Sequence, residues 1–363
     1  MSRQPLKKSL ASPAMQLAEL ELSLVSIPQA EGSEAVRSLV VRLITDDGLE
    51  GWGEAPTGWR SDELNSRAAV LRAVILGRNA FDIEELLTLD VLQNAQVRCA
   101  VEMAAWDLVG RRANMPLCHL FGGCYRRRVP LAIRLHARHP RQAAKLSAEL
   151  AQQGFHAHVV TATGRPETDL TMLRAVREAV GDRAQLRLDG AERFDMETAR
   201  DLCAELEFDA IEFLLDPLNT RQLHAAAALG RQTTVPLALS RAITRPGEVL
   251  AAVRSGAARF VVLRLPELGG LLTTQKSASV AAAAGLKTLA CTGPSLGIAT
   301  AAMLQLAAAL PVLDGCNECA YPQLHDDVLT ERLELVDGML TVPQSPGLGV
   351  TVDRGKLEQY QVT

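Results

Sequence analysis

The order of apolar and polar residues divides the chain into two parts. Between residues 16 and 54 apolar residues come in short β-branched runs, and "LVVRLITDDGLEGWGEA" places the turn signal Asp-Asp-Gly between two of them. This pattern predicts three strands that include a hairpin. Residues 62–123 instead repeat small and apolar residues at helical spacing, with Ala100 and Leu108 on one stripe, so they are predicted to be helical.

From about residue 129 the pattern changes to short apolar strands that alternate with amphipathic helices. "VPLAIRLHA" is a predicted strand and "PRQAAKLSAELAQQG" the helix after it; six more such pairs follow, and a short eighth strand is expected near residues 312–316. Regular alternation with short loops predicts a parallel sheet, and seven or eight units favour a closed α/β barrel. The final stretch "LELVDGMLTVPQSPGLGVTVD" is predicted to form strand, turn and loop and to return to the N-terminal part.

Composition restricts the classes of function. The net charge of −4, from 38 basic and 42 acidic residues, argues against a nucleic-acid partner. No apolar run approaches the roughly 18 residues of a membrane span, so no membrane partner is expected. The first 20 residues lack the apolar core of a signal peptide and are expected to be a loose tail. Seven cysteines, an odd number, favour free thiols and a cytoplasmic location.

A barrel carries its chemistry at the carboxyl ends of its strands. Candidate functional residues are therefore sought at the predicted strand ends, which are Thr161, Asp189, Leu215, Arg241, Arg264 and Gly293.

Two short motifs offer other chemistry. "GPSLG" matches the G-x-S-x-G pattern of a hydrolase nucleophile, but Pro294 before Ser295 restricts the required turn and the pattern is frequent by chance. "CNEC" gives Cys316 and Cys319 the spacing of a metal-binding pair, but no second pair matches it, so incidental thiols are the preferred interpretation.

Five stretches resemble the enolase superfamily, in the branch of muconate lactonizing enzymes, mandelate racemase and dipeptide epimerases: "GLEGWGEA", "AVEMAAWDLVGRRANMPLCHLFGG", "AVREAVGDRAQLRLDG", "LPELGGLLTTQKSASVAAAAGL" and "DGMLTVPQSPGLGV". The similarity runs in order from about residue 16 to 355. It implies an α/β fold with a modified (β/α)7β barrel over residues 129–324. It also implies an α+β capping domain over residues 1–128, completed by the tail from about 325 to 363, and a homo-oligomer.

The resemblance further implies abstraction of a proton next to a carboxylate. In this family three carboxylates at successive strand ends hold a Mg²⁺ that neutralises the enolate, and lysines move the proton. The first ligand position corresponds to Asp189, the second to Leu215 and the third to Arg241. The spacing supports this assignment, since 215 − 189 = 26 and 241 − 215 = 26, about one strand–helix unit each.

Two of the three ligand positions therefore lack an oxygen donor, and the guanidinium at the third repels a dication. An ion pair between Asp189 and Arg241 is expected in its place, and both a structural salt bridge and a substrate-binding role stay open for Arg241. The neighbouring Asp216 is expected to point to the opposite side of its strand from Leu215, into the barrel wall or toward a loop. Asp189 is thus the only metal ligand predicted.

The lysine positions are also replaced. Anchored on Gly154, the two positions on the second strand become Val159 and Thr161; counted back from Asp189, they become His158 and Val160. No lysine is available in either register. His158 is a candidate base, with a satisfied barrel histidine as the alternative. On the sixth strand the lysine position is Arg264, a poor proton shuttle but a good partner for carboxylates, and both a catalytic and a substrate-binding role are considered.

Two further residues are candidates for substrate contact. Ser295 lies in a loop that faces the substrate in the resembling family. Trp59 flanks the loop that closes over the substrate there, and Trp52 is assigned to the core.

Three hypotheses follow. The first is a divergent family member that binds a small carboxylate or other anion at the barrel mouth through Arg241, Arg264 and the loop after the seventh strand, with no cofactor and with any isomerase or lyase chemistry independent of metal. The second is a working Mg²⁺-dependent racemase, epimerase or cycloisomerase. The third is a non-catalytic binding or scaffold protein.

Overall fold

The computed structural model describes residues 14–29 and 34–362. The expected N-terminal tail lies outside these ranges for most of its length. Within them, none of the helices combines the length and the apolar character that crossing a membrane requires.

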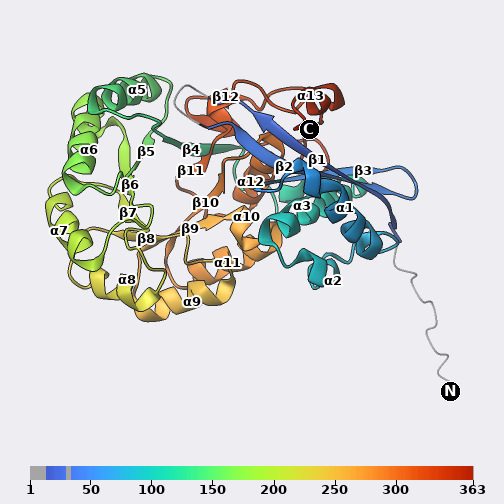
Figure 1. Cartoon of the computed structure of the whole chain (residues 1–363), viewed down its shortest axis with the longest axis horizontal. Helices are drawn as coiled ribbons and strands as arrows, with labels where there is room; N and C mark the ends of the chain where they lie inside the picture. The colour runs from blue at the N-terminus through green and yellow to red at the C-terminus, as the bar shows by residue number, and fades with distance from the viewer. Residues whose placement is uncertain (1–13, 30–33, 363) are drawn as a thin grey trace, which may run out of the picture.

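The N-terminal part is a three-stranded antiparallel sheet covered by helices, as predicted (Figure 1). Its strands are β1 (Leu17–Ile27), β2 (Val36–Thr45) and β3 (Glu50–Pro56), and its helices are α1 (Ser61–Ile75), α2 (Ile83–Leu86), α3 (Ala95–Arg112) and α4 (Leu117–Leu120). Gly48, with φ of +84°, makes the predicted turn between β2 and β3. Helix α3 lies so close to β3 that a Cβ atom on Gly53 would meet the Ala100 carbonyl oxygen at 1.9 Å.

The second part is a closed parallel barrel, which confirms the predicted fold class. Its strands are β4 (Arg128–Arg134), β5 (Ala157–Thr161), β6 (Gln185–Asp189), β7 (Phe213–Leu215), β8 (Leu237–Leu239), β9 (Phe260–Arg264), β10 (Lys287–Gly293) and β11 (Asn317–Cys319). Each pairs with the next, and β11 pairs with β4 to close the ring.

The eighth strand begins later than predicted, at Asn317 instead of near residue 312. The apolar residues of "PVLDGC" suggested a strand, but Pro311, Asp314 and Gly315 make this segment a turn. The strand itself contains the polar residues Asn317 and Glu318, so it does not form an apolar run in the sequence.

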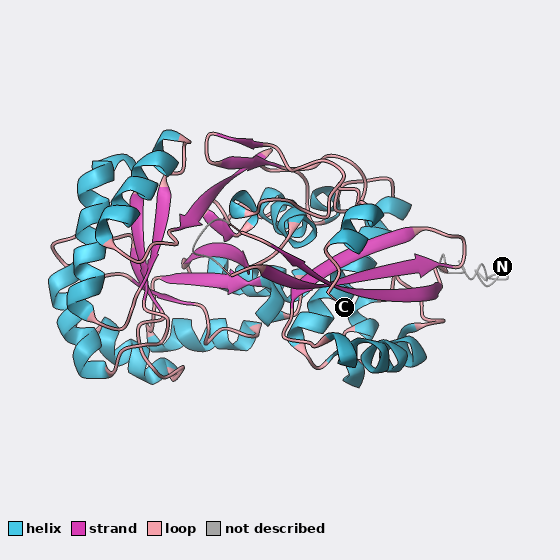
Figure 2. Ribbon diagram, turned by 45° about the horizontal axis from the view of Figure 1, so that its top comes forward, coloured by secondary structure: helices cyan, strands magenta, loops and turns pink. Residues whose placement is uncertain are grey.

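Helices surround the barrel (Figure 2). They are α5 (Pro140–Gln152), α6 (Pro166–Val180), α7 (Met196–Leu206), α8 (Leu223–Gly230), α9 (Pro246–Ser255), α10 (Leu265–Leu268), α11 (Leu271–Ala283) and α12 (Gly297–Ala309), with short 3₁₀ turns at Gly181–Arg183 and Tyr321–Gln323. A further 3₁₀ turn, Asp90–Leu92, lies in the N-terminal part between α2 and α3. Every residue of α12 is buried, because this helix lies between the barrel and the N-terminal sheet.

Two buried carboxylates join the N-terminal part to the barrel. Glu54 of β3 accepts hydrogen bonds from the backbone N–H groups of Leu296 and Ala299 at the start of α12, at 2.7 and 2.9 Å. Glu102 of α3 accepts in the same way from Leu271 and Leu272 at the start of α11. Each carboxylate thus satisfies N–H groups that a helix leaves unpaired at its first turn. Burial raises the pKa of both to about 7.

The C-terminal segment contacts both parts of the molecule. Strands β12 (Leu335–Val336) and β13 (Met339–Thr341) form a hairpin that pairs with β4. After α13 (Arg354–Gln359), the Val362 N–H donates to the Leu24 carbonyl of β1 at 2.8 Å. The predicted return to the N-terminal part is therefore present, together with an additional contact to the barrel.

Candidate anion site at the barrel mouth

A cavity of about 390 Å³ opens at the carboxyl ends of the barrel strands. Its charged walls come from strands far apart in the sequence and are formed by Arg134, Asp189, Arg193, Arg241, Arg264 and Glu318. We call it the lower cavity. Its position is the one that a parallel barrel gives to ligand sites.

Asp189 lies between two guanidinium groups. Arg134 Nη1 donates to Asp189 Oδ2 at 2.9 Å, and Arg241 Nη1 donates to Asp189 Oδ1 at 3.1 Å. Burial opposes the charge of Asp189, but the two arginines together hold its pKa below the usual range. The expected ion pair with Arg241 is therefore present, and a second ion pair with Arg134 accompanies it.

The ion pairs extend beyond Asp189 on both sides. Arg134 Nη2 reaches Glu318 Oε1 at 2.7 Å, which joins the first barrel strand to the last. Arg241 Nη1 reaches Asp216 Oδ2 at 3.1 Å. The result is a chain of alternating charges, Glu318–Arg134–Asp189–Arg241–Asp216, that crosses the barrel mouth.

Asp216 points toward a loop and contacts Arg241. Its φ of +40° ends strand alternation and turns the carboxylate toward the loop after β8, where it accepts from the N–H groups of Ser240 and Arg241 at 2.9 and 3.0 Å. Of the two expected directions, the barrel wall or a loop, the structure shows the loop, and the ion pair with Arg241 is an additional contact. Burial raises the pKa of Asp216.

Strand pairing decides the register of β5. Thr161 pairs with Asp189 and Val159 with Arg187, so Val159 and Thr161 face the barrel interior. Asp189 in turn pairs with Leu215, whose side chain is buried in a cluster inside the barrel. Of the two registers considered for the lysine positions, the one with Val159 and Thr161 places both residues toward the barrel interior.

His158 faces away from the cavity. Its side chain is fully buried, its Nδ1 lies 2.5 Å from Ser147 Oγ of α5, and its Nε2 lies 3.1 Å from the Phe155 carbonyl oxygen. Burial lowers its pKa to about 4. This placement does not support the expected role as a base, because no ligand in the barrel mouth reaches the ring.

Ser295 is also turned inward. It is fully buried and its hydroxyl donates to Thr292 Oγ1 at 2.6 Å, so it does not line the cavity at the barrel mouth as expected. Gly293, two residues earlier, does line that cavity. A Cβ atom at this position would lie 3.2 Å from Arg264 Nη2, so the glycine leaves room for the guanidinium.

Arg264 has unused hydrogen-bonding capacity. Its Nη2 pairs with Glu267 Oε1 at 2.8 Å, whereas Nε and Nη1 donate to no protein group in the part of the chain that the structure describes. The side chain is 23% exposed and lines the lower cavity. A planar group with two free donors on a cavity wall suits a carboxylate or phosphate oxygen.

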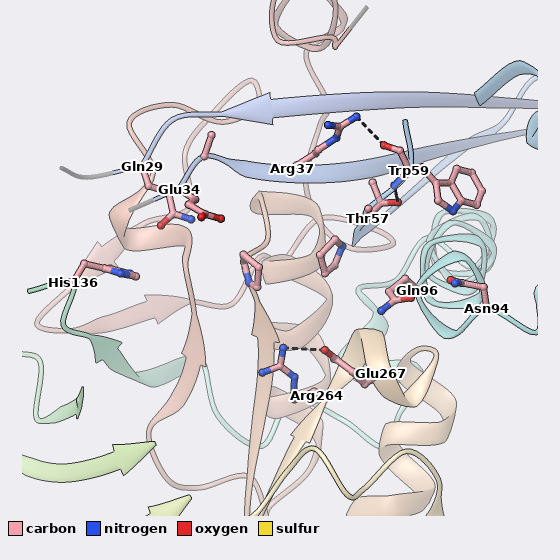
Figure 3. Close-up of a pocket in the computed structure, with 14 residues that line it drawn as sticks. Gln29, Glu34, Arg37, Thr57, Trp59, Asn94, Gln96, His136, Arg264 and Glu267 are labelled. Atoms are coloured by element: carbon pink, nitrogen blue, oxygen red, sulfur yellow. Dashed lines mark hydrogen bonds and ion pairs between the residues drawn. The ribbon is translucent and has the colours of Figure 1, made fainter. Parts of the chain in front are cut away.

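A second cavity of about 720 Å³ lies above the first, between the barrel and the N-terminal sheet (Figure 3). We call it the upper cavity. Trp59 forms part of its wall, with its carbonyl accepting from Arg37 Nη2 at 2.7 Å and its ring 4.5 Å from the Arg67 guanidinium. Trp59 thus lines a cavity, and its contact with substrate stays a prediction. Trp52 is buried in the core as predicted.

Comparisons with known proteins identify the family. Residues 21–122 match the mandelate racemase / muconate lactonizing enzyme N-terminal domain, and residues 141–356 match the enolase C-terminal domain-like family. The chain belongs to the enolase superfamily. It falls in the mandelate racemase and muconate lactonizing enzyme branch.

Several relatives of this enolase-superfamily chain are similar along most of their length. A chloromuconate cycloisomerase from Cupriavidus necator is 28% identical, covering 89% of this chain and 91% of the relative. A probable glucarate dehydratase from Streptomyces coelicolor is 31% identical, covering 88% and 83%. The crystal structure of a 2-chloromuconate cycloisomerase from Rhodococcus opacus superimposes with a TM-score of 0.87 at 25% identity, covering 96% of this chain and 99% of that one.

Two residues of the charged chain were missed by sequence reasoning. Arg134 ends β4, but the predicted strand continued to Ala137, so this residue was not placed at a strand end. Glu318 lies inside "CNEC", a motif that was interpreted only through its two cysteines. Among residues 14–29 and 34–362, no group of three or more His, Cys, Asp or Glu side chains is arranged to hold a metal ion.

Proposed function

We propose that this enolase-superfamily protein binds a small carboxylate or another small anion at the barrel mouth, without Mg²⁺. The observation that carries the proposal is Arg264, whose guanidinium lines the cavity with two donors free of protein partners. Family membership supports the position of the site, since this fold binds its ligands at the barrel mouth.

The residues around Asp189 do not suit a hard dication. Mg²⁺ requires oxygen donors in near-octahedral geometry, and both Asp189 oxygens already accept from guanidinium groups. The adjacent strand offers Leu215 at the paired position. Arg241 keeps its positive charge at any useful pH and would repel the ion at close range.

The arginines supply the positive charge that the metal supplies elsewhere in the family. Arg134 and Arg241 are neutralised by Asp189, Glu318 and Asp216, so they set the shape of the cavity. Arg264 has one acidic partner and keeps an open edge. A charge-assisted hydrogen bond from this edge to an anion contributes about 1.5–3 kcal/mol.

Calorimetry in metal-free buffer with EDTA tests the proposal. The parent protein should bind small carboxylates, and Arg264→Gln should weaken binding at least about tenfold. Arg254→Gln on α9 removes an arginine outside both cavities and is the matched control.

Two results would contradict the proposal. One is equal carboxylate affinity in the parent and in Arg264→Gln. The other is binding of Mg²⁺ by the parent with a dissociation constant of about 1 mM or tighter, or a requirement for Mg²⁺ in anion binding.

A further inference from the structure

The two cavities form one chamber with different charge at its two ends. They share Gln29, His136, Arg264 and Pro294 in their walls, so a ligand that reaches Arg264 from below has the upper cavity open in front of it. Together they provide the space of a small-molecule site. The question is which chemical group of a ligand the upper cavity accepts.

The lower cavity is the cationic end. Four arginines line it against two carboxylates, Asp189 and Glu318. Arg193 lies on its rim, is exposed, and forms no ion pair with any other described residue. The carboxylate end of a ligand is therefore expected here, beside Arg264.

The upper cavity has a different charge balance beyond Arg264. Glu34 and Glu267 balance the charges of Arg264 and Arg37 there, whereas the lower cavity has two more arginines than carboxylates. Arg37 Nη2 donates to the Trp59 carbonyl. Figure 3 shows Glu34 beside Gln29 on the wall opposite Arg264 and Glu267. The other side chains that can form hydrogen bonds there are neutral at pH 7 and comprise Gln29, Thr57, Asn94, Gln96 and His136.

We propose that the ligand is a monocarboxylate whose far end carries a hydrogen-bonding group that is not anionic, such as an amide, hydroxyl or ammonium group. This inference rests on the proposed function and adds the ligand class. A second carboxylate would meet Glu34 and Glu267, and like charges brought together are a common way to reject a ligand. An apolar tail would leave the polar walls of the upper cavity without partners.

The inference separates this chain from relatives named for dicarboxylates. Muconate and glucarate carry a carboxylate at each end, and those acids appear in the names of a chloromuconate cycloisomerase and a probable glucarate dehydratase. Here the second carboxylate is the feature expected to be rejected.

A matched series of six-carbon acids tests this directly. Hexanoate has an apolar tail, adipate a second carboxylate, adipamate a terminal amide and 6-aminohexanoate a terminal ammonium group. Calorimetry at low ionic strength should show adipamate and 6-aminohexanoate binding about tenfold more tightly than adipate, and more tightly than hexanoate.

Variants assign the discrimination to the upper cavity. Glu34→Gln should tighten adipate binding several-fold and leave hexanoate binding unchanged, because of these two acids only adipate places a negative charge near this wall. Glu19→Gln, on the exposed face of β1 and outside both cavities, is the matched control and should change neither.

The outcomes keep the two proposals apart. If adipate or hexanoate binds as tightly as adipamate, and binding is still lost in Arg264→Gln, the ligand class is wrong and the anion site stands. If none of the four acids binds, or if they bind the parent and Arg264→Gln equally, the proposed function itself is wrong.

Discussion

Replacing Asp189 by Asn gives opposite results for a charge-bridged site and for a vacant metal site. Asp189 is 3% exposed and accepts from Arg134 and Arg241 at 2.9 and 3.1 Å. Removing its charge leaves both guanidinium groups with less compensation, so the variant should be less stable. In an empty metal site made of several carboxylates, the same change would relieve repulsion between them and stabilise the metal-free protein.

The size of the effect follows from the remaining partners. Removing one member of a buried ion pair typically costs 3–5 kcal/mol. Arg134 keeps Glu318 and Arg241 keeps Asp216, and both arginines are about a quarter exposed, so we expect a loss of about 2 kcal/mol. For a chain of this size that corresponds to a decrease in Tm of about 3 °C.

Urea denaturation in EDTA measures this difference. Asp201→Asn, on the exposed face of α7, is the control and should change the free energy of unfolding by less than about 0.5 kcal/mol. Because the folded-state pKa of Asp189 is depressed, its contribution is present above the ordinary aspartate pKa of about 4 and is lost as the pH falls through the lower folded value. An Asp189→Asn variant as stable as the parent at pH 7, or more stable, would refute the reasoning.

Three further predictions concern metal, ligand and pH. The double variant Leu215→Glu/Arg241→Glu places carboxylates beside Asp189 and should bind Mg²⁺ in calorimetry, whereas the parent should not; equal heats from both would be contrary to this expectation. Burial lowers the pKa of His136 from its ordinary value of about 6.5, so the ring gains its proton, and the chamber wall a positive charge, only below that pH. Anion affinity should therefore rise as the pH falls below about 6.5, and an equal rise in His136→Gln would exclude this residue as the cause. The free energy of unfolding should fall between pH 5 and 8, because the raised pKa values of Glu54 and Glu102 favour folding at low pH and this contribution is lost as the pH rises through about 7. Glu54→Gln should make the pH profile flatter, and a profile identical to that of the parent would contradict the assignment.

Strand spacing in the sequence was sufficient to find the main residues of the barrel mouth. Asp189, Leu215 and Arg264 each end a strand, and the repeat of one strand–helix unit fixed their order. The ion pair of Asp189 with Arg241 followed from their opposite charges at the ends of β6 and β8, which flank β7.

Other features depend on geometry that apolar patterns do not encode. Neighbouring positions on a strand face opposite sides, so one residue of uncertainty in β5 was enough to place His158 inside or outside the barrel. Strand β11 has three residues and two of them are polar, so the eighth strand was predicted too early in the sequence and Glu318 was not assigned to it. The left-handed conformation of Asp216 is a backbone property that residue type alone does not specify.

The carboxylate joints between the sheet and the barrel have a consequence for how this protein can diversify. Glu54 and Glu102 hold helix starts that lie apart from the walls of the chamber. Loops that contribute Glu34 or Trp59 can therefore exchange residues while the alignment of the two halves is preserved. Under the proposed function, the two ends of the chamber can in this way evolve independently of the joint between the sheet and the barrel.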